Sequence, residues 1–197
     1  MIEKKNHRPI RSFVRRMGRT KPSQQKAFDR LWALWGRAVS AGALDIETTF
    51  GQKNKTILEI GFGMGQSLLE MAQQSPETNF IGIDVHRPGV SALLSGIERE
   101  GLSNLRLYQE DAIDVLNHCI ADHSLDTVQL FFPDPWPKSR HHKRRLVQPT
   151  FIALLHQKLK SGGLIHFATD WAHYAHHMMA VLEASPDVKN LAGKDLF

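Results

Sequence analysis

Apolar positions along the chain follow two different spacings, and the change between them divides the sequence. Residues 24–39 carry apolar side chains at helical intervals, which predicts a helix. Glycine and polar residues interrupt this pattern at 51–54. Beyond that point, short apolar runs alternate with amphipathic segments. The runs predict strands at 56–61, 79–85, 104–109, 125–132 and 162–169. The segments between them predict helices that begin near Gly65 and that span 88–100, about 112–120, about 147–160 and about 171–184.

Strict alternation of strands and helices predicts an α/β fold. The strands are too apolar to leave one face in water, so we expect a doubly wound, mostly parallel sheet with helices on both sides. In such sheets ligands bind beyond the carboxyl ends of the strands. The residues that directly follow each strand are therefore the first candidates for a functional site.

Composition adds limits on class and location. The length of 197 residues fits one domain with a substantial core. Apolar runs are too short for a transmembrane span, and the charged N-terminus lacks the apolar centre of a secretory signal, although its arginines partly fit a transit peptide. The single Cys119 excludes a disulfide framework and fits a reducing compartment. We expect a soluble, cytoplasmic protein.

Positive charge is concentrated in two places. Residues 1–30 hold ten basic and two acidic residues, a net charge of +8, whereas residues 31–197 carry a net charge of −3. A second basic cluster spans 138–145. We therefore divide the chain into a basic N-terminal arm and helix (1–50) and a sheet domain (51–197). The asymmetry indicates a polyanionic partner, although a solvated arm that aids solubility has the same composition.

The turn after the strand at 56–61 is rich in glycine, with Gly61, Gly63 and Gly65 in LEIGFGMGQ. Gln66 stands where a dinucleotide-binding turn needs its third glycine, which disfavours an NAD-dependent oxidoreductase. Glycines let the backbone approach a ligand closely. Glu59, just before the turn, suits a ligand that carries an ammonium and a sulfonium group and repels a pyrophosphate. The pattern favours S-adenosylmethionine.

Two further acids follow the next two strands. Asp84 stands where a carboxylate can accept hydrogen bonds from both ribose hydroxyls of an adenosine cofactor. Asp111 can bind the adenine amino group, although an aspartate there is also a common cap of the following helix. Acids at three successive strand ends, together with the glycine turn, predict an S-adenosylmethionine site.

The stretch FFPDPWPKSRHHKRR at 131–145 leaves the strand at 125–132 and changes from apolar to basic. Three prolines stiffen the backbone around Asp134, which we expect near the transferable methyl group because this strand should lie beside the one at 56–61. The alternative is a proline-rich loop that only closes a strand. Amino-group methyltransferases carry an Asn/Asp-Pro-Pro-aromatic motif in this slot, and the Pro-Asp-Pro-Trp order breaks it.

Cations and histidines follow at the mouth of the same predicted pocket. A cluster of this kind indicates a nucleic-acid acceptor, because phosphate contacts supply most of the non-specific affinity for nucleic acids. A solvated helix start would have the same composition. The candidate nucleic-acid-contacting residues are Arg140, His141, His142, Lys143, Arg144 and Arg145.

Five segments, in this order, resemble the bacterial tRNA (guanine-N7-)-methyltransferases, which are class I S-adenosylmethionine-dependent enzymes with a Rossmann-like fold. The segments are LEIGFGMGQSL, GIDVHRPGV, GLSNLRL, VQLFFPDPWPKSRHHKRR and HFATDW. The resemblance covers about residues 10–184. It implies methyl transfer to N7 of the guanine at position 46, in the variable loop of tRNA, with 7-methylguanosine and S-adenosylhomocysteine as products.

The resemblance also implies roles for single residues and a mode of assembly. Asp134 matches the proposed catalytic residue, and Lys138 and Asp170 match substrate-binding positions. Bacterial members work without a second type of subunit, so we expect a monomer or homodimer with tRNA as partner. The acids that match cofactor-contacting positions are Glu59, Asp84, Asp111 and Asp134.

One departure from the family concerns the C-terminal end. The family continues with a T-x-F-E-x-R-G motif and the last strands of the sheet, whereas this sequence stops at GKDLF (193–197). We therefore expect the methyltransferase domain to be incomplete: either the sequence is part of a longer chain, or part of the guanine pocket is missing.

Alternative functions stay open at this point. They are a catalytically inactive RNA-binding module of the same fold and an amino-group methyltransferase. His173 and His177 have the spacing of a metal-binding pair on a helix, but the sequence offers no third ligand near them, so we expect no metal site.

Overall fold

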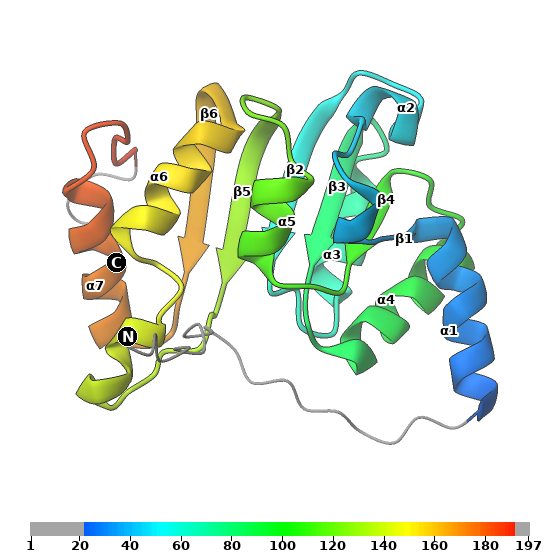
Figure 1. Cartoon of the computed structure of the whole chain (residues 1–197), viewed down its shortest axis with the longest axis horizontal. Helices are drawn as coiled ribbons and strands as arrows, with labels where there is room; N and C mark the ends of the chain where they lie inside the picture. Colours follow the sequence, from blue (N-terminus) through cyan, green and yellow to red (C-terminus); the bar gives the residue numbers. More distant parts are fainter. Residues whose placement is uncertain (1–21, 192–197) are drawn as a thin grey trace, which may run out of the picture.

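The computed structural model describes residues 22–191, and these form a parallel six-stranded sheet flanked by helices (Figure 1). The strand order is β1-β4-β3-β2-β5-β6, and every neighbouring pair is parallel. The strands are β1 (Gly36–Arg37), β2 (Lys55–Ile60), β3 (Thr78–Ile83), β4 (Leu105–Tyr108), β5 (Leu125–Phe131) and β6 (Leu159–Ala168). The α-helices are α1 (Pro22–Trp35), α2 (Ile46–Phe50), α3 (Gln66–Gln74), α4 (Arg87–Glu100), α5 (Ala112–His118), α6 (Pro149–Lys158) and α7 (Ala172–Glu183). Two 3-10 segments complete the order, η1 (Val39–Ala41) and η2 (Ser139–Arg144). The predicted α/β fold is confirmed.

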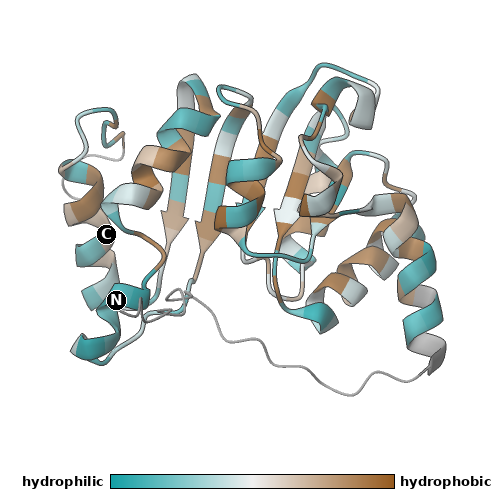
Figure 2. Ribbon diagram, viewed as in Figure 1, coloured by the Kyte–Doolittle hydropathy of each residue, from teal (hydrophilic) through white to brown (hydrophobic). Residues whose placement is uncertain are grey.

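Each face of the sheet has its own hydrophobic core. Helices α1, α3 and α4 bury apolar side chains on one face, among them the fully buried Leu68 and Leu94. Helices α5, α6 and α7 cover the other face, with the fully buried Val115 and Leu155. Burial of one such side chain stabilises the fold by about 1.5–3 kcal/mol. In Figure 2 the apolar colours follow the strands and the helix surfaces turned toward them. Packing in these two cores holds the strands in place, and with them the residues at their carboxyl ends, where the candidate site lies.

The predicted strands and helices from residue 56 onward are all present, with ends shifted by a few residues. The predicted helix at 24–39 stops earlier, at Trp35, because Gly36 begins the short strand β1. A side chain at Gly36 would collide with the ring of Trp32, so this position accepts only glycine. The sequence did not predict β1, because its two residues are extended only through pairing with Leu107 and Tyr108 of β4.

Strand β6 departs from the prediction that both sheet faces are covered. Leu164 is 43% exposed, and His166 is also exposed. On the opposite side of the same strand, Ile165 and Phe167 pack against the core. In the described part of the chain, β6 is therefore an edge strand with one solvent-exposed face.

Residues 22–50 pack onto the rest of the sheet domain. Arg30 donates two hydrogen bonds to the carboxylate of Glu98 at 2.6 and 3.0 Å, and the backbone N–H of Val39 donates to Glu110 at 2.9 Å. Predictions for the arm before residue 22 and for GKDLF at 193–197 lie outside the described residues. Within residues 22–191, no helix combines the length and apolar character needed to cross a bilayer.

The close approach of α4 to the glycine-rich turn gives a first test. A Cβ atom at Gly89 would overlap the carbonyl oxygen of Gly63, which is backbone and cannot move aside. We expect Gly89→Ala to lower the free energy of unfolding by about 1–3 kcal/mol in urea titrations. Gly96→Ala is the matched control on the same helix, because the nearest atoms to its Cβ belong to the side chain of Leu69, at 2.7 Å, and a side chain can change rotamer where backbone cannot. Equal stability of the two variants would contradict the assignment.

Candidate active site

The turn between β2 and α3 forms one wall of the site. Gly61, Gly63 and Gly65 all have positive φ, at 76°, 58° and 79°. A Cβ atom at Gly61 or Gly63 would meet no atom within 4 Å, so the turn leaves open space beside its backbone. The N–H of Gly61 donates to the carbonyl of Ile83 at 2.7 Å, which joins the turn to the end of β3. The geometry is a cradle that a ligand can fill.

Asp84, the residue after β3, is bound into this turn. Its Oδ2 accepts from the N–H of Gly63 at 2.8 Å, and its Oδ1 accepts from the N–H of His86 at 2.7 Å. Burial raises the pKa of Asp84, and the two backbone donors oppose that shift. Each carboxylate oxygen keeps a second lone pair. Asp84 can therefore stabilise the turn and still accept hydrogen bonds from a ligand.

Glu59 is the most unusual acid of the site. Only 3% of it is exposed, and its Oε2 has no hydrogen-bond partner among residues 22–191. Burial, followed by the nearby charge of Asp84, raises the pKa of Glu59 to about 7. A buried acceptor without a partner is costly unless a ligand supplies the donor. A cationic donor fits this position, as the ammonium end of S-adenosylmethionine would.

Asp111 lies at the third strand end and also caps α5. Its Oδ1 accepts from the N–H of Ile113 at 3.0 Å, so the expected capping role is present. Asp84 and Asp111 line one cavity of about 680 Å³, together with Gly61 and Asp134. The cavity thus joins the acids predicted for the cofactor to the acid predicted for the acceptor, while Glu59, Gly63 and Gly65 lie outside its lining.

The loop after β5 forms the opposite wall. Phe132 and Trp136 have positive φ angles of 50° and 45°, a conformation that is rare for bulky residues and that persists only where the surroundings enforce it. Phe132 is 66% exposed, and its N–H donates to the carbonyl of Ala168 at 2.8 Å. Asp134 is exposed on the same loop. The positive φ angles of Phe132 and Trp136 indicate that this loop has a function besides ending the strand.

The pairing of β5 with β6 brings the two candidate acceptor acids to one edge. Phe131 pairs with Ala168, so Asp134 and Asp170 follow neighbouring strands within a few residues of their ends. Both side chains are exposed, as is that of Lys138. Neither Lys138 nor Asp170 is among the residues that line the 680 Å³ cavity.

The basic stretch forms the 3-10 segment η2 beside this loop. Arg140 and Lys143 are exposed, and the guanidinium of Arg144 lies 5.0 Å from the centre of the Trp136 ring. The ring of His141 meets Trp136 edge-on at 5.8 Å. Burial, and then the neighbouring cations, lower the pKa of His141, so this histidine gains charge only at a lower pH than a free imidazole. Trp136 is half-buried between these groups and also lines the 680 Å³ cavity.

Comparison with known proteins decides the family. The family model Methyltransf_4, described as "Putative methyltransferase", matches residues 53–196. The tRNA (guanine-N(7)-)-methyltransferase of Alcanivorax borkumensis is 54% identical over 190 residues, which cover 96% of this chain and 80% of the relative. The protein of the same name from Ectopseudomonas mendocina is 53% identical over 188 residues, with coverage of 95% and 79%. The chain belongs to the tRNA (guanine-N(7)-)-methyltransferase family.

Solved structures support the fold of this methyltransferase. The aminoglycoside resistance methyltransferase NpmB1 matches with a TM-score of 0.52 and 19% identity, over 72% of this chain and 69% of its own. An antibiotic-related methyltransferase matches with a TM-score of 0.50 and 16% identity, over 70% and 73%. At these identities the likeness concerns the Rossmann-like fold alone.

Two of the residues predicted to contact RNA in this methyltransferase have buried polar atoms. Arg145 is only 2% exposed, and the Nε2 of His142 is buried without a hydrogen-bond partner in the described part of the chain. Burial, and then the nearby Arg145, lower the pKa of His142. The sequence could not separate these two from their neighbours, because their burial depends on packing against α7. In this structure the guanidinium of Arg145 contacts Pro135, His173 and Tyr174, and its contact with RNA stays a prediction.

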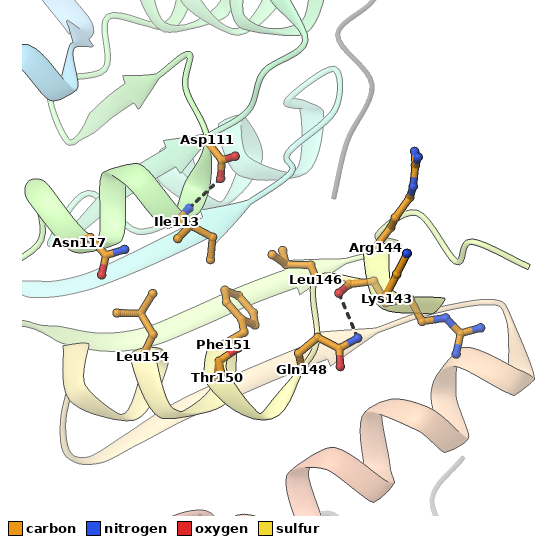
Figure 3. A pocket seen from close by; sticks show the side chains of 11 residues that line it. Asp111, Ile113, Asn117, Lys143, Arg144, Leu146, Gln148, Thr150, Phe151 and Leu154 are labelled. Atoms are coloured by element: carbon orange, nitrogen blue, oxygen red, sulfur yellow. Dashed lines mark hydrogen bonds between the residues drawn. The ribbon is translucent and has the colours of Figure 1, made fainter. Parts of the chain in front are cut away.

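A second cavity of about 400 Å³ lies between α5, α6 and the end of η2 (Figure 3). In this view Asp111 lies at the top and Lys143 and Arg144 lie to the right, with Leu146 between them and Phe151 and Leu154 below. Sequence reasoning missed this cavity, because its walls come from three separate elements. It also missed Glu110, which lines the 680 Å³ cavity while holding the backbone of Val39.

No group of three metal-binding side chains occurs within residues 22–191. The two histidines with metal-pair spacing have separate partners: His177 contacts the carbonyl of Val147 through Nε2 at 2.8 Å, and His173 contacts Arg145 through Nδ1 at 3.1 Å. Both imidazoles are thus engaged within the protein.

The raised pKa of Glu59 gives a test that needs no turnover. Because the folded state binds this proton more tightly than the unfolded state, whose pKa is near 4.5, the carboxyl destabilises the fold as pH rises from about 4.5 to about 7. We expect Glu59→Gln to raise the free energy of unfolding of the ligand-free protein by up to about 3 kcal/mol at pH 8 and to leave it nearly unchanged at pH 4.5.

The same variant should bind S-adenosylmethionine at least about tenfold more weakly in calorimetry, because a carboxylate that meets a cation is lost. Glu70→Gln, on the exposed face of α3, is the control. A stability gain that is the same at both pH values would rule out the buried charge as its cause.

Proposed function

We propose that this chain transfers the methyl group of S-adenosylmethionine to N7 of a guanine in tRNA, at position 46 of the variable loop. The observation that carries the proposal is the identity of 53–54% over nearly the whole chain with proteins named for tRNA (guanine-N(7)-)-methyl transfer. The arrangement of acids and cations around one cavity supports it. S-adenosylhomocysteine is then the second product.

The cofactor side of the cavity is assigned to three acids and the glycine turn. S-adenosylmethionine supplies a sulfonium methyl group for an in-line displacement. We assign Glu59 to the cationic methionyl end, because its free oxygen is buried and unpartnered. Asp84 is assigned to the ribose hydroxyls and the free oxygen of Asp111 to the adenine amino group, since each retains acceptor capacity.

The acceptor side needs positioning more than proton transfer. Guanine N7 attacks with a lone pair and has no proton to lose, so most of the rate enhancement can come from orientation. We assign Asp134 and Asp170 as acceptors for the guanine N1–H and amino group, which turns N7 toward the methyl group. A carboxylate there also stabilises the positive charge that develops on the ring. Lys138 is assigned to a phosphate or to guanine O6.

The outer surface of the site suits tRNA. Exposed Arg140 and Lys143 can contact phosphates. Phe132 and Trp171, which are 66% and 44% exposed, offer aromatic faces to an extruded base. We also propose that the enzyme works in the cytoplasm as a monomer or homodimer without a second type of subunit, and without a metal ion.

The decisive test is methyl transfer from labelled S-adenosylmethionine to two unmodified tRNAs. They are identical except that one carries adenine in place of the variable-loop guanine at position 46. We expect label on the guanine tRNA alone, with 7-methylguanosine recovered after digestion. Equal labelling of both would mean that the target base is wrong. Cofactor binding without transfer to either would instead favour an inactive RNA-binding module.

A substitution at Asp134 tests whether its carboxylate acts in methyl transfer or in the binding of tRNA. We expect Asp134→Ala to lower kcat by about a hundredfold or more, because the carboxylate orients the base and meets developing charge. The affinity for tRNA should stay within about threefold, since phosphate contacts dominate it. Single-turnover transfer and filter binding measure the two quantities. An equal loss in both would show that Asp134 is only a binding residue.

A further inference from the structure

Arg145 is a buried cation with no acidic partner. It is 2% exposed, and no carboxylate of residues 22–191 forms an ion pair with it. Its Nη1 is buried and makes no hydrogen bond within the described part of the chain. A buried charge without a counter-charge lowers the stability of the fold. The burial of Arg145 therefore points to a role other than stabilisation.

The side-chain hydrogen bonds of Arg145 run to the loop after β5 (residues 132–138, the acceptor loop) and to α7. Nε donates to the carbonyl of Pro135 at 2.9 Å, and Nη2 lies 3.1 Å from Nδ1 of His173. The guanidinium also lies 4.8 Å from the centre of the Tyr174 ring, within range of a cation–π interaction. One side chain thus links the loop that carries Asp134 to the first turn of α7.

The loop depends on such an external donor. Pro133, Pro135 and Pro137 have no N–H group, so the segment around Asp134 has few donors with which to anchor itself. The strained φ angles of Phe132 and Trp136 persist only if neighbouring structure holds the loop in place. The hydrogen bond to the Pro135 carbonyl is a direct hold on the residue next to Asp134.

Helix α7 is itself fixed to the segment that carries Arg145. The hydroxyl of Tyr174 accepts from the N–H of Val147 at 3.3 Å, and His177 contacts the carbonyl of Val147 at 2.8 Å. Tyr174 is fully buried. The backbone just after Arg145 is therefore fixed to α7 from both sides, and the guanidinium reaches from there back to the loop.

We infer that Arg145 is a positioning residue for methyl transfer, whose guanidinium holds the Pro135 carbonyl against α7 and thereby fixes the Asp134 carboxylate at the acceptor site. The inference rests on the proposed function. Arginine can only donate, so His173 accepts through Nδ1 and carries its proton on Nε2. His173 completes the hold as the acceptor for the second nitrogen.

The experiment compares Arg145→Lys and Arg145→Met with Arg140→Met, which removes an exposed cation from the same segment. We expect both Arg145 variants to lower kcat about ten- to a hundredfold, because small misplacement of a catalytic group is costly. Their affinity for tRNA, and the slope of log affinity against log salt, should stay unchanged. Arg140→Met should instead reduce that slope by about one. A reduced slope in Arg145→Met would mean that Arg145 is a phosphate contact and would overturn the inference.

Two His173 variants provide a check that does not alter the buried cation. His173→Asn retains an acceptor near the position of Nδ1, whereas His173→Leu removes it. We expect His173→Leu to lower kcat about three- to tenfold and His173→Asn to restore it to within about twofold. If Arg145→Met does not fold, this pair and Arg145→Lys still decide the matter. Equal loss in the two His173 variants would contradict the hold.

Hydrogen–deuterium exchange separates this inference from the proposed function. Loss of the hold should speed exchange in peptides that span 131–145 and leave peptides that span β2 and α3 unchanged. If the unaltered protein methylates no tRNA, the proposed function fails, while the exchange result still shows whether Arg145 holds the loop. Unchanged exchange in Arg145→Lys and His173→Leu would overturn the hold itself.

Discussion

The pairing of β2 with a parallel neighbour on each side is the constraint on which the site depends. Because β3 and β5 both run beside β2, three carboxyl ends meet at one edge of the sheet. The hydrogen bond from Gly61 to the end of β3 starts the glycine turn at that level, and Asp84 then holds the turn through Gly63. The acceptor loop leaves β5 on the other side. A change in this strand order would separate the cofactor acids from Asp134.

The site keeps two buried ionisable groups that lack a partner of opposite charge within residues 22–191. Glu59 lies in β2, two residues before Gly61 of the glycine turn, and Arg145 contacts Pro135 of the acceptor loop. Each costs stability, which the apolar cores on the two sheet faces offset. Neither belongs to those apolar cores: Glu59 precedes Ile60 and Gly61, which line the 680 Å³ cavity, and Arg145 lines the 400 Å³ cavity. This distribution fits an enzyme that accepts lower stability at the positions where a ligand or a reacting group must be held.

Local sequence patterns were enough to predict most of the fold and part of the site. A few neighbouring residues are enough to recognise the glycine turn, the acids after each strand and the proline-rich loop. The alternation of strands and helices then predicts the sheet edge where these features meet. The exposed face of β6 and the strand β1 were not predictable, because both depend on which elements pack beside them. Arg145 shows the same limit more sharply. It follows Arg144 in a basic stretch, and only the packing against α7 buries Arg145 while Arg144 stays half-buried over the ring of Trp136.

Asp111 belongs to the walls of both cavities, and one of its oxygens is already engaged as the cap of α5. Its carboxylate therefore lies in a wall that the two cavities share. Two ligands, one in each cavity, that compete for this carboxylate would weaken each other's binding by equal factors, as thermodynamic linkage requires. A carboxylate in a shared wall can thus couple two neighbouring cavities without any movement of the backbone.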